Sequence, residues 1–234
     1  MKLSAYARML LGVSAIAAGI VGLVWHGSEA WQNLHLTAVP FGPIVAWILA
    51  FAQIAGGIAL AFTPAVRAGA IAVGAIYLLF SLSCIPGMVA APRDPGSYVD
   101  IFEQFSIVCG AMAVCGSRGW ARVLLGICAL SFAWAQVAFF QYTASLVPTW
   151  IPPSQAFWTT LTTIAFALAG IAAIANLRAR LALRLMALMM ALFGLLVWVP
   201  RIAAHPHEMS YWNEIATNYL ITGATWLVAE LAAA

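Results

Sequence analysis

The sequence predicts an all-α integral membrane protein with eight transmembrane helices, arranged as two parallel four-helix-bundle repeats. Hydrophobic residues make up 65% of the 234 residues and charged residues only 7%, whereas a soluble domain carries about 25% charged residues. Such a composition suits a surface that faces lipid. The apolar stretches are long and lack the alternation typical of strands, which favours helices over a β-barrel. An internal repeat then indicates how the helices are grouped.

Eight apolar stretches are each long enough to form a spanning helix, which needs about 20 residues. They cover residues 3–25, 41–62, 68–89, 99–115, 120–140, 154–174, 181–199 and 212–231. The first begins with Lys2 and Arg8 and so resembles a signal peptide. Its apolar part is too long for one, and it has a counterpart in the second half of the chain. We therefore interpret it as a helix that is retained.

Three features of the first half recur about 113 residues later. They are a Ser-Tyr pair that opens an apolar stretch, a Gly-Ala pair within that stretch, and a proline that ends the stretch before it. The matching positions are Ser97-Tyr98 and Ser210-Tyr211, Gly110-Ala111 and Gly223-Ala224, and Pro86 and Pro200. Self-similarity at about half the chain length indicates duplication. It predicts one repeat over 1–117 and a second over 118–234, parallel because each has an even number of spans.

The charged residues predict how the helices are oriented in the membrane. Most Lys and Arg residues fall in turns on the N-terminal side, and only Arg93 and Arg201 lie on the other side. By the positive-inside rule, both termini are expected to be cytoplasmic, in a multi-pass protein of the cell (inner) membrane. The lipid bilayer is therefore the predicted environment. The net charge of +3 lies mainly in these turns and does not indicate a nucleic-acid-binding surface.

Polar residues near the outer ends of the fourth and eighth stretches form the candidate ligand-binding site. Asp100 and Glu103 are three residues apart on one helical face, and Glu214 and Asn218 are four apart in the equivalent stretch. One interpretation is capping, because the helix dipole stabilises negative charge at a helix N-terminus. The other is that these residues line an outward-facing cavity and bind the polar head of a ligand or exchange protons with it. The other candidate ligand-binding residues are Tyr98, Tyr211, Trp212 and Arg201.

The two halves do not carry their acidic residues at equivalent positions. When the repeats are aligned, Glu103 matches Ala216 and Glu214 matches Ile101. We therefore expect the halves to contribute unequally to any site, with the second half as the better candidate because it holds more polar groups.

Histidines near the outer side are weak candidates for a metal site. His205, His207 and Glu208 lie within four residues of one another, and imidazole with carboxylate suits Zn, Cu or Fe. However, His-Pro-His-Glu is not a recognised ligand spacing, so no metal site is favoured. A second group of this kind comprises His26, Glu29 and His35. The sequence contains no glycine-rich phosphate loop, HExxH motif or nucleophile elbow, so the catalytic residues are unknown.

Motifs rich in tryptophan and proline suggest a family resemblance. They are Val147-Pro148-Thr149-Trp150-Ile151-Pro152-Pro153 with Phe157-Trp158, then Trp198-Val199-Pro200-Arg201, then the stretch 205–214, with a weaker echo in Pro40-Phe41-Gly42-Pro43 and Trp47. In these motifs the chain resembles the DoxX-like family of four-helix membrane proteins, here as a tandem duplication. The resemblance implies a four-helix bundle for each repeat, quinone as a ligand and membrane redox subunits as partners. It implies no set of catalytic residues.

The predicted function is binding of a lipophilic small molecule, with quinone suggested by the resemblance, in an outward-facing cavity that supports a membrane redox process. Three alternatives stay open. The protein could be a non-catalytic subunit or scaffold of a larger complex. It could be a transporter, although few ionisable residues lie near the midplane, where transporters bind their substrates. It could also be a sterol-isomerase-like membrane enzyme that uses paired carboxylates, so whether it is an enzyme is open.

Overall fold

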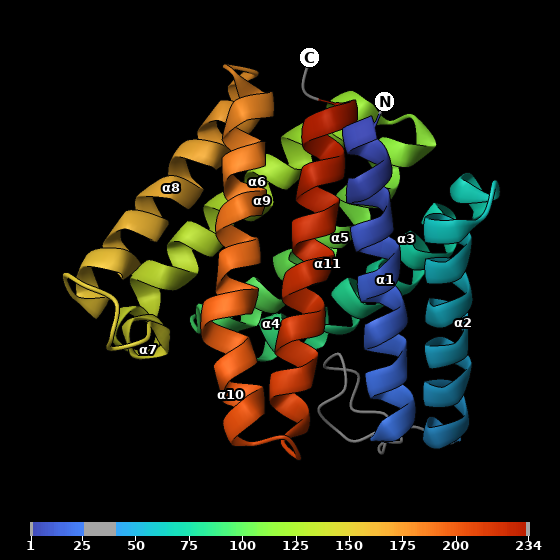
Figure 1. The fold of residues 1–234 in the computed structure, drawn as a ribbon, viewed down its shortest axis with the longest axis horizontal. Helices are drawn as coiled ribbons and strands as arrows, with labels where there is room; N and C mark the ends of the chain where they lie inside the picture. The colour runs from blue at the N-terminus through green and yellow to red at the C-terminus, as the bar shows by residue number, and fades with distance from the viewer. Residues whose placement is uncertain (1, 26–40, 233–234) are drawn as a thin grey trace.

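The computed structural model describes residues 2–25 and 41–232, and within these ranges all regular secondary structure is helical. The elements, shown in Figure 1, are α1 (Lys2–Val24), α2 (Gly42–Phe62), α3 (Val66–Ser83), α4 (Ile85–Ala90), α5 (Gly96–Cys115), α6 (Arg118–Ala138), α7 (Phe140–Leu146), α8 (Gln155–Ala175), α9 (Ala179–Phe193), the π-helix η3 (Gly194–Trp198), α10 (Val199–Ala204) and α11 (Met209–Leu231). The all-helical prediction is confirmed for this part of the chain.

Seven helical segments are long and apolar enough to cross a membrane, so the chain is a multi-pass membrane protein in its fold. Two of them are composite, because Val66–Ala90 joins α3 to α4 and Ala179–Ala204 joins α9, η3 and α10. The eighth expected span, 212–231, lies in α11, which has 23 residues but is not among the seven. Most of α11 from Ala216 to Ala229 is buried in protein.

The helices pack as neighbours in chain order, and two central helices join the first and second halves. In the first half, α1 packs on α2, α2 on α3, and α3 on α5; in the second, α6 packs on α8, α8 on α9, and α9 on α11. The halves meet where α1 packs on α11, α5 on α6, and α5 on α11. Helices α5 and α11 therefore lie at the centre. Helix α1 begins and α11 ends at the same end of the molecule (Figure 1).

Two of the spans are interrupted next to a proline, where the sequence predicts a continuous helix. The first breaks at Cys84 between α3 and α4, and the second passes through η3 before α10. Pro86 and Pro200 are the second residues of α4 and α10. A proline has no N–H for the helical hydrogen bond, and its ring clashes with the carbonyl four residues earlier. The chain therefore leaves regular α-helical geometry just before each proline.

The turns that follow α4 and α10 are closed by the same kind of hydrogen bond. In the first turn, the hydroxyl of Tyr98 donates to the carbonyl oxygen of Pro92 at 2.5 Å. In the second, the indole Nε1 of Trp212 donates to the carbonyl oxygen of Pro206 at 2.9 Å. Each bond joins an aromatic residue at the start of a central helix to a proline six residues earlier.

Glycines allow two pairs of helices to touch through their backbones. A Cβ atom at Gly57 would lie 2.5 Å from the carbonyl oxygen of Gly12, and one at Gly170 would lie 2.7 Å from that of Gly126. These glycines belong to the α1–α2 and α6–α8 contacts. Small residues at helix contacts permit this close approach in membranes, where packing and hydrogen bonding hold helices together.

Candidate functional site

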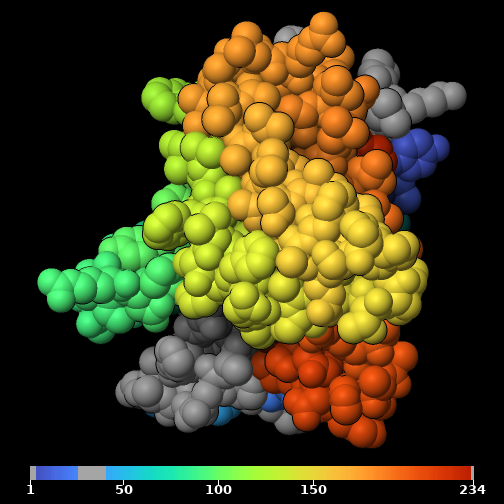
Figure 2. Space-filling view, turned by 90° about the vertical axis from the view of Figure 1, so that its left-hand side faces the viewer, coloured from blue at the N-terminus to red at the C-terminus, as the bar shows by residue number. Residues whose placement is uncertain are grey.

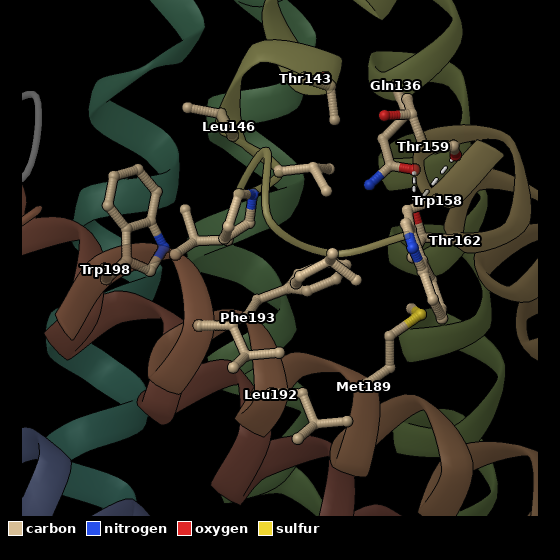
Figure 3. Close-up of a pocket in the computed structure, with 15 residues that line it drawn as sticks. Gln136, Thr143, Leu146, Trp158, Thr159, Thr162, Met189, Leu192, Phe193 and Trp198 are labelled. Carbon is tan, nitrogen blue, oxygen red and sulfur yellow. Dashed lines mark hydrogen bonds between the residues drawn. The ribbon is translucent and has the colours of Figure 1, made fainter. Parts of the chain in front are cut away.

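Two adjoining cavities lie between α5, α6 and α11 on one side and α7, α8, α9 and η3 on the other. The first, here called the polar chamber, has a volume of about 270 Å³ and includes Glu103, Gln136, Glu214 and Asn218 in its lining. The second, here called the apolar chamber, has a volume of about 230 Å³ and a mostly hydrophobic lining (Figure 3). The two share Gln136, Thr143, Leu146, Phe193 and Trp198. They therefore adjoin, and together they offer a polar and an apolar end.

The segment that holds α7 and the turn before α8 covers the apolar chamber. On the face shown in Figure 2, this segment (yellow-green to yellow) lies between the α8–α9 turn (orange, above) and the α10–α11 turn (orange-red, below). Val147, Pro148 and Ile151 of the turn contribute apolar surface to the chamber. Sequence analysis predicts an uninterrupted stretch to residue 140 and does not predict α7.

Two carboxyl groups make the lining of the polar chamber acidic. Glu103 comes from the second turn of α5 and is half-buried, and Glu214 comes from the second turn of α11 and is exposed. Both line the chamber, so two acidic side chains share one cavity. No Lys, Arg or His is among the described residues that line either chamber. The lining therefore favours cationic or hydrogen-bond-donating groups over anions.

Gln136 presents a hydrogen-bond donor at the junction of the two chambers. Its side-chain oxygen accepts hydrogen bonds from the hydroxyls of Thr162 at 3.1 Å and Thr163 at 2.9 Å. Because the oxygen is held by α8, the amide nitrogen points away from these threonines and toward the cavity (Figure 3). Gln136 can therefore donate to an oxygen atom of a ligand.

Asn218 lines the polar chamber and carries a buried acceptor without a partner. Its side chain is only 7% exposed, and its Oδ1 atom is buried without a hydrogen-bond partner in the described part of the chain. An unsatisfied buried acceptor costs about 1–3 kcal/mol. A hydrogen bond donated to this atom would remove that cost.

Aromatic rings form rigid walls around both chambers. Phe166 packs edge-to-face against Phe132 and Phe193, with centroids 5.6 and 6.2 Å apart, and all three rings line the polar chamber. In the apolar chamber, Trp158 is fixed by a 2.9 Å hydrogen bond from its Nε1 to the carbonyl oxygen of Pro152. Such walls suit the flat or chain-like apolar part of a lipophilic ligand.

The π-helix η3, which directly follows α9, forms part of the wall of the apolar chamber. Leu196, Val197 and Trp198 of η3 line the apolar chamber. At its start, a Cβ atom on Gly194 would lie 2.6 Å from the ring of Tyr219, so this position needs glycine for close packing. Single π-helical turns inside α-helices are frequent at functional sites.

The structure brings together three of the eight expected ligand-binding residues. Glu103, Glu214 and Asn218 line the polar chamber, whereas Asp100 is half-buried one turn before Glu103 and does not line either chamber. Most of the lining comes from the second half of the chain, with Val99 and Glu103 contributed by the first.

The remaining four expected residues line neither chamber and contact other partners. Tyr98 and Trp212 hold the proline turns described above. The ring of Tyr211 packs against Trp198 and His205, with centroids 6.3 and 6.0 Å apart.

Arg201 packs against Trp198, a residue of the chamber wall. Its guanidinium lies over the ring of Trp198 at 5.6 Å and donates to the carbonyl oxygen of Ser145 at 3.4 Å. It forms no ion pair with a described acidic residue; the salt bridge in this part of the chain joins Arg184 to Glu230. Arg201 therefore positions Trp198, which lines both chambers.

The histidine-rich turn before α11 does not assemble a metal site. His205, His207 and Glu208 are all exposed. Within the described ranges, no group of three His, Cys, Asp or Glu residues is placed to hold a metal ion. The second candidate group, His26, Glu29 and His35, lies outside the described residues.

Gln136, Trp158 and Trp198 are among the many lining residues that the sequence does not assign to the site. Gln136 offers the clearest signal, because an amide within an apolar helix needs a partner. Gln53 gives the same signal, yet it bonds to the hydroxyl of Tyr77. An amide of this kind therefore indicates a buried contact without distinguishing a ligand from a neighbouring helix.

Comparison of the chain with family models, with curated proteins and with solved structures finds no match. The chemistry of the two chambers therefore carries the functional argument.

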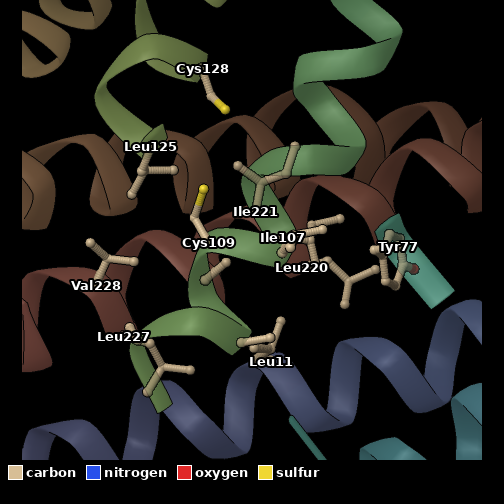
Figure 4. Packing of buried hydrophobic residues seen from close by; sticks show 14 of the residues in the cluster. Leu11, Tyr77, Ile107, Cys109, Leu125, Cys128, Leu220, Ile221, Leu227 and Val228 are labelled. Carbon is tan, nitrogen blue, oxygen red and sulfur yellow. The ribbon is translucent and has the colours of Figure 1, made fainter. Parts of the chain in front are cut away.

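The chambers end at a tightly packed core toward the end where α1 begins. Ile221 lines the polar chamber and is 2% exposed. Beyond it, Cys109, Leu125 and Val228 are fully buried between α5, α6 and α11 (Figure 4). The described residues thus separate the chambers from the opposite end of the molecule.

Proposed function

We propose that the protein binds a lipophilic small molecule with a polar head in the two adjoining chambers, in support of a membrane redox process. The head would lie in the polar chamber, between Glu103, Gln136 and Asn218, and the apolar part would lie against Trp158. The observation that carries this proposal is the convergence of these polar groups beside an aromatic chamber. The redox context and the membrane redox subunits as partners come from the resemblance to DoxX-like proteins.

A quinol is the ligand that fits the lining best. Carboxylates only accept hydrogen bonds, and Asn218 offers a further unpaired acceptor. The two hydroxyls of a quinol donate, whereas the carbonyls of the corresponding quinone only accept. Gln136 and Thr143 could still donate to ring oxygens in either form. We therefore expect the reduced form to bind more tightly.

We also propose eight spans in two parallel DoxX-like repeats, 1–117 and 118–234. Matching local geometry supports this. The residues that directly follow α4 and α10, Ala91 and His205, have φ/ψ of −129°/64° and −136°/70°. The glycine contacts recur at matching positions. Each turn is also closed by an aromatic-to-proline hydrogen bond over six residues, although the second donor, Trp212, is one residue after the match of Tyr98. The helix contacts of one half also match those of the other.

The chambers are proposed to open to the outer side of the cell membrane, with both termini in the cytoplasm. The distribution of Lys and Arg supports this orientation, as does the position of Glu214 near the start of α11, opposite the end where α1 begins. The packed core below the chambers argues against a transport path through the molecule.

Reporter fusions test the eight-span topology. We expect a C-terminal fluorescent-protein fusion to fluoresce and a C-terminal alkaline phosphatase fusion to be inactive, because α11 would return the chain to the cytoplasm. A phosphatase inserted after Arg93, in the turn before α5, should be active and serves as the matched control. An active phosphatase and a non-fluorescent fluorescent protein at the C-terminus would mean that the chain has seven spans.

Tryptophan fluorescence tests ligand binding, because Trp158 and Trp198 line the apolar chamber. We expect a benzoquinol with a ten-carbon chain to quench the fluorescence of the purified protein saturably under anaerobic conditions. It should bind about tenfold more tightly than the matching benzoquinone, because hydrogen bonds to charged groups contribute about 1.5–3 kcal/mol each. Linear quenching by both probes, without saturation, would contradict the proposal.

A second function is favoured by one observation, the placement of Glu103 and Glu214 in the same aromatic-walled chamber. An isomerase could use one carboxyl group to give a proton to a sterol-like substrate and the other to remove one. Recovery of a sterol probe with a shifted double bond after incubation would favour this enzyme over a binding protein.

A further inference from the structure

Three arginines surround a hollow at the start of α9, at the end of the molecule opposite the chambers. The hollow has a volume of about 380 Å³ and is lined by Arg178, Arg180 and Arg184 together with Ala179 and Leu181. The side chains of Arg178 and Arg180 are exposed. The hollow is large enough for a phosphate group with its ester oxygens, and its charge is positive.

An apolar hollow adjoins this basic one along the membrane-spanning helices. It has a volume of about 350 Å³, and its lining includes Leu10 of α1, Leu188 and Ala191 of α9, and Trp226 of α11. Arg184 lines both hollows. Leu188 is 57% exposed, so the hollow lies at the surface that faces lipid. Between Arg184 and Ala191 it follows α9 for about 10 Å, at 1.5 Å per residue.

The acidic residue in this region is already engaged. Glu230 accepts two hydrogen bonds from Arg184, at 2.6 and 2.8 Å, and a third from Trp226 at 3.3 Å. Arg180 reaches the carbonyl oxygens of Ala229 and Glu230 only at 3.4 and 3.5 Å. One carboxylate therefore faces three guanidinium groups, and the basic hollow keeps an excess of positive charge.

This concentration of arginine is not a general property of turns at this end. The equivalent turn of the first half, between α2 and α3, is followed by Arg67 alone, and the α5–α6 turn is followed by two arginines, Arg118 and Arg122. The turn with the most arginines, between α8 and α9, is thus the turn that adjoins the apolar hollow beside Trp226.

We propose that the α8–α9 end binds one anionic phospholipid, with its phosphate between Arg178, Arg180 and Arg184 and one acyl chain along the hollow beside Trp226. Guanidinium groups bind phosphate oxygens in a planar, two-pronged geometry, and basic pockets between transmembrane helices bind anionic lipid head groups. The apolar hollow selects a lipid over a free phosphate, because only a lipid supplies an acyl chain. This site does not depend on the function of the chambers.

Native mass spectrometry of the purified protein with added lipids tests the proposal. We expect dioleoyl phosphatidylglycerol to be retained in preference to dioleoyl phosphatidylcholine, and glycerol 1-phosphate not to be retained. Replacing two exposed arginines, R178Q with R180Q, should weaken phosphatidylglycerol binding about twenty-five-fold, at about fivefold per arginine. Ala191→Phe should fill the apolar hollow and weaken lipid binding with all three arginines intact.

The matched control removes the same charge from other exposed positions at this end, with R67Q and R118Q. It should leave phosphatidylglycerol binding unchanged. Equal losses in the two double variants would show that lipid binding follows total charge and would overturn the site. Equal retention of phosphatidylcholine, or retention of glycerol 1-phosphate, would overturn the proposed ligand.

Discussion

Replacing Glu103 and Glu214 together by glutamine is expected to weaken binding of the benzoquinol probe by about thirtyfold. Hydrogen bonds to charged groups contribute about 1.5–3 kcal/mol, against about 0.5–1.5 kcal/mol for neutral ones, so each replacement should cost about 1 kcal/mol. Both side chains line the polar chamber, where no described Lys or Arg competes for them. Quenching of Trp158 and Trp198 provides the measurement.

Two further variants make this result specific to the chamber. Asp100→Asn removes a carboxylate one turn from Glu103 that lines neither chamber, and it should leave binding unchanged. Asn218→Leu removes the unpaired acceptor, so it should weaken binding while thermal stability is kept or raised. Wild-type affinity in the double glutamine variant would mean that the head group binds elsewhere.

Alanine at Gly57 or at Gly170 is expected to destabilise the fold by about 1–3 kcal/mol, as overpacking does elsewhere. The new Cβ would lie 2.5 Å from Gly12 O or 2.7 Å from Gly126 O, and a backbone atom cannot move aside without separating the two helices. For a chain of this size the melting temperature should fall by about 3–10 °C. Thermal unfolding in detergent measures the change.

Gly119→Ala is the matched control, because nothing lies within 4 Å of its Cβ position in the first turn of α6. Alanine favours helix over glycine by up to about 1 kcal/mol, so this variant should be unchanged or slightly more stable. If alanine at Gly119 lowered the melting temperature as much as alanine at Gly57, the close helix contacts would not be the cause of the loss of stability. Similar losses at Gly57 and Gly170 would further support the duplication.

The long apolar helices could be predicted from composition because lipid imposes both their length and their apolar character. The stretch 154–174, for example, is helix α8, Gln155–Ala175. The breaks in the spans at Cys84 and at η3 could not be predicted from composition. Pro86 and Pro200 mark them, but whether a helix ends, kinks or adopts π-geometry at a proline depends on which neighbours satisfy the freed backbone groups.

The candidate site could be predicted in part, for a similar reason. Glu103 and Glu214 are conspicuous because ionisable groups are rare in spanning helices. Tyr98 and Trp212 looked equally suited to a cavity wall, yet both satisfy proline carbonyls in their own turns. Trp158 enters the site only because α8 packs on α9, and such tertiary proximity leaves no local signal.

The central position of α11 has a consequence for how the chain is made. Its polar residues, such as Thr217 and Thr225, are buried by protein, and they make α11 the least suited of the long helices to enter lipid by hydrophobicity alone. Because α11 packs on α1, α5 and α9, which are synthesised before it, its insertion is expected to follow their assembly. Completion of the proposed ligand site, which needs Glu214 and Asn218, would then follow the assembly of these three helices.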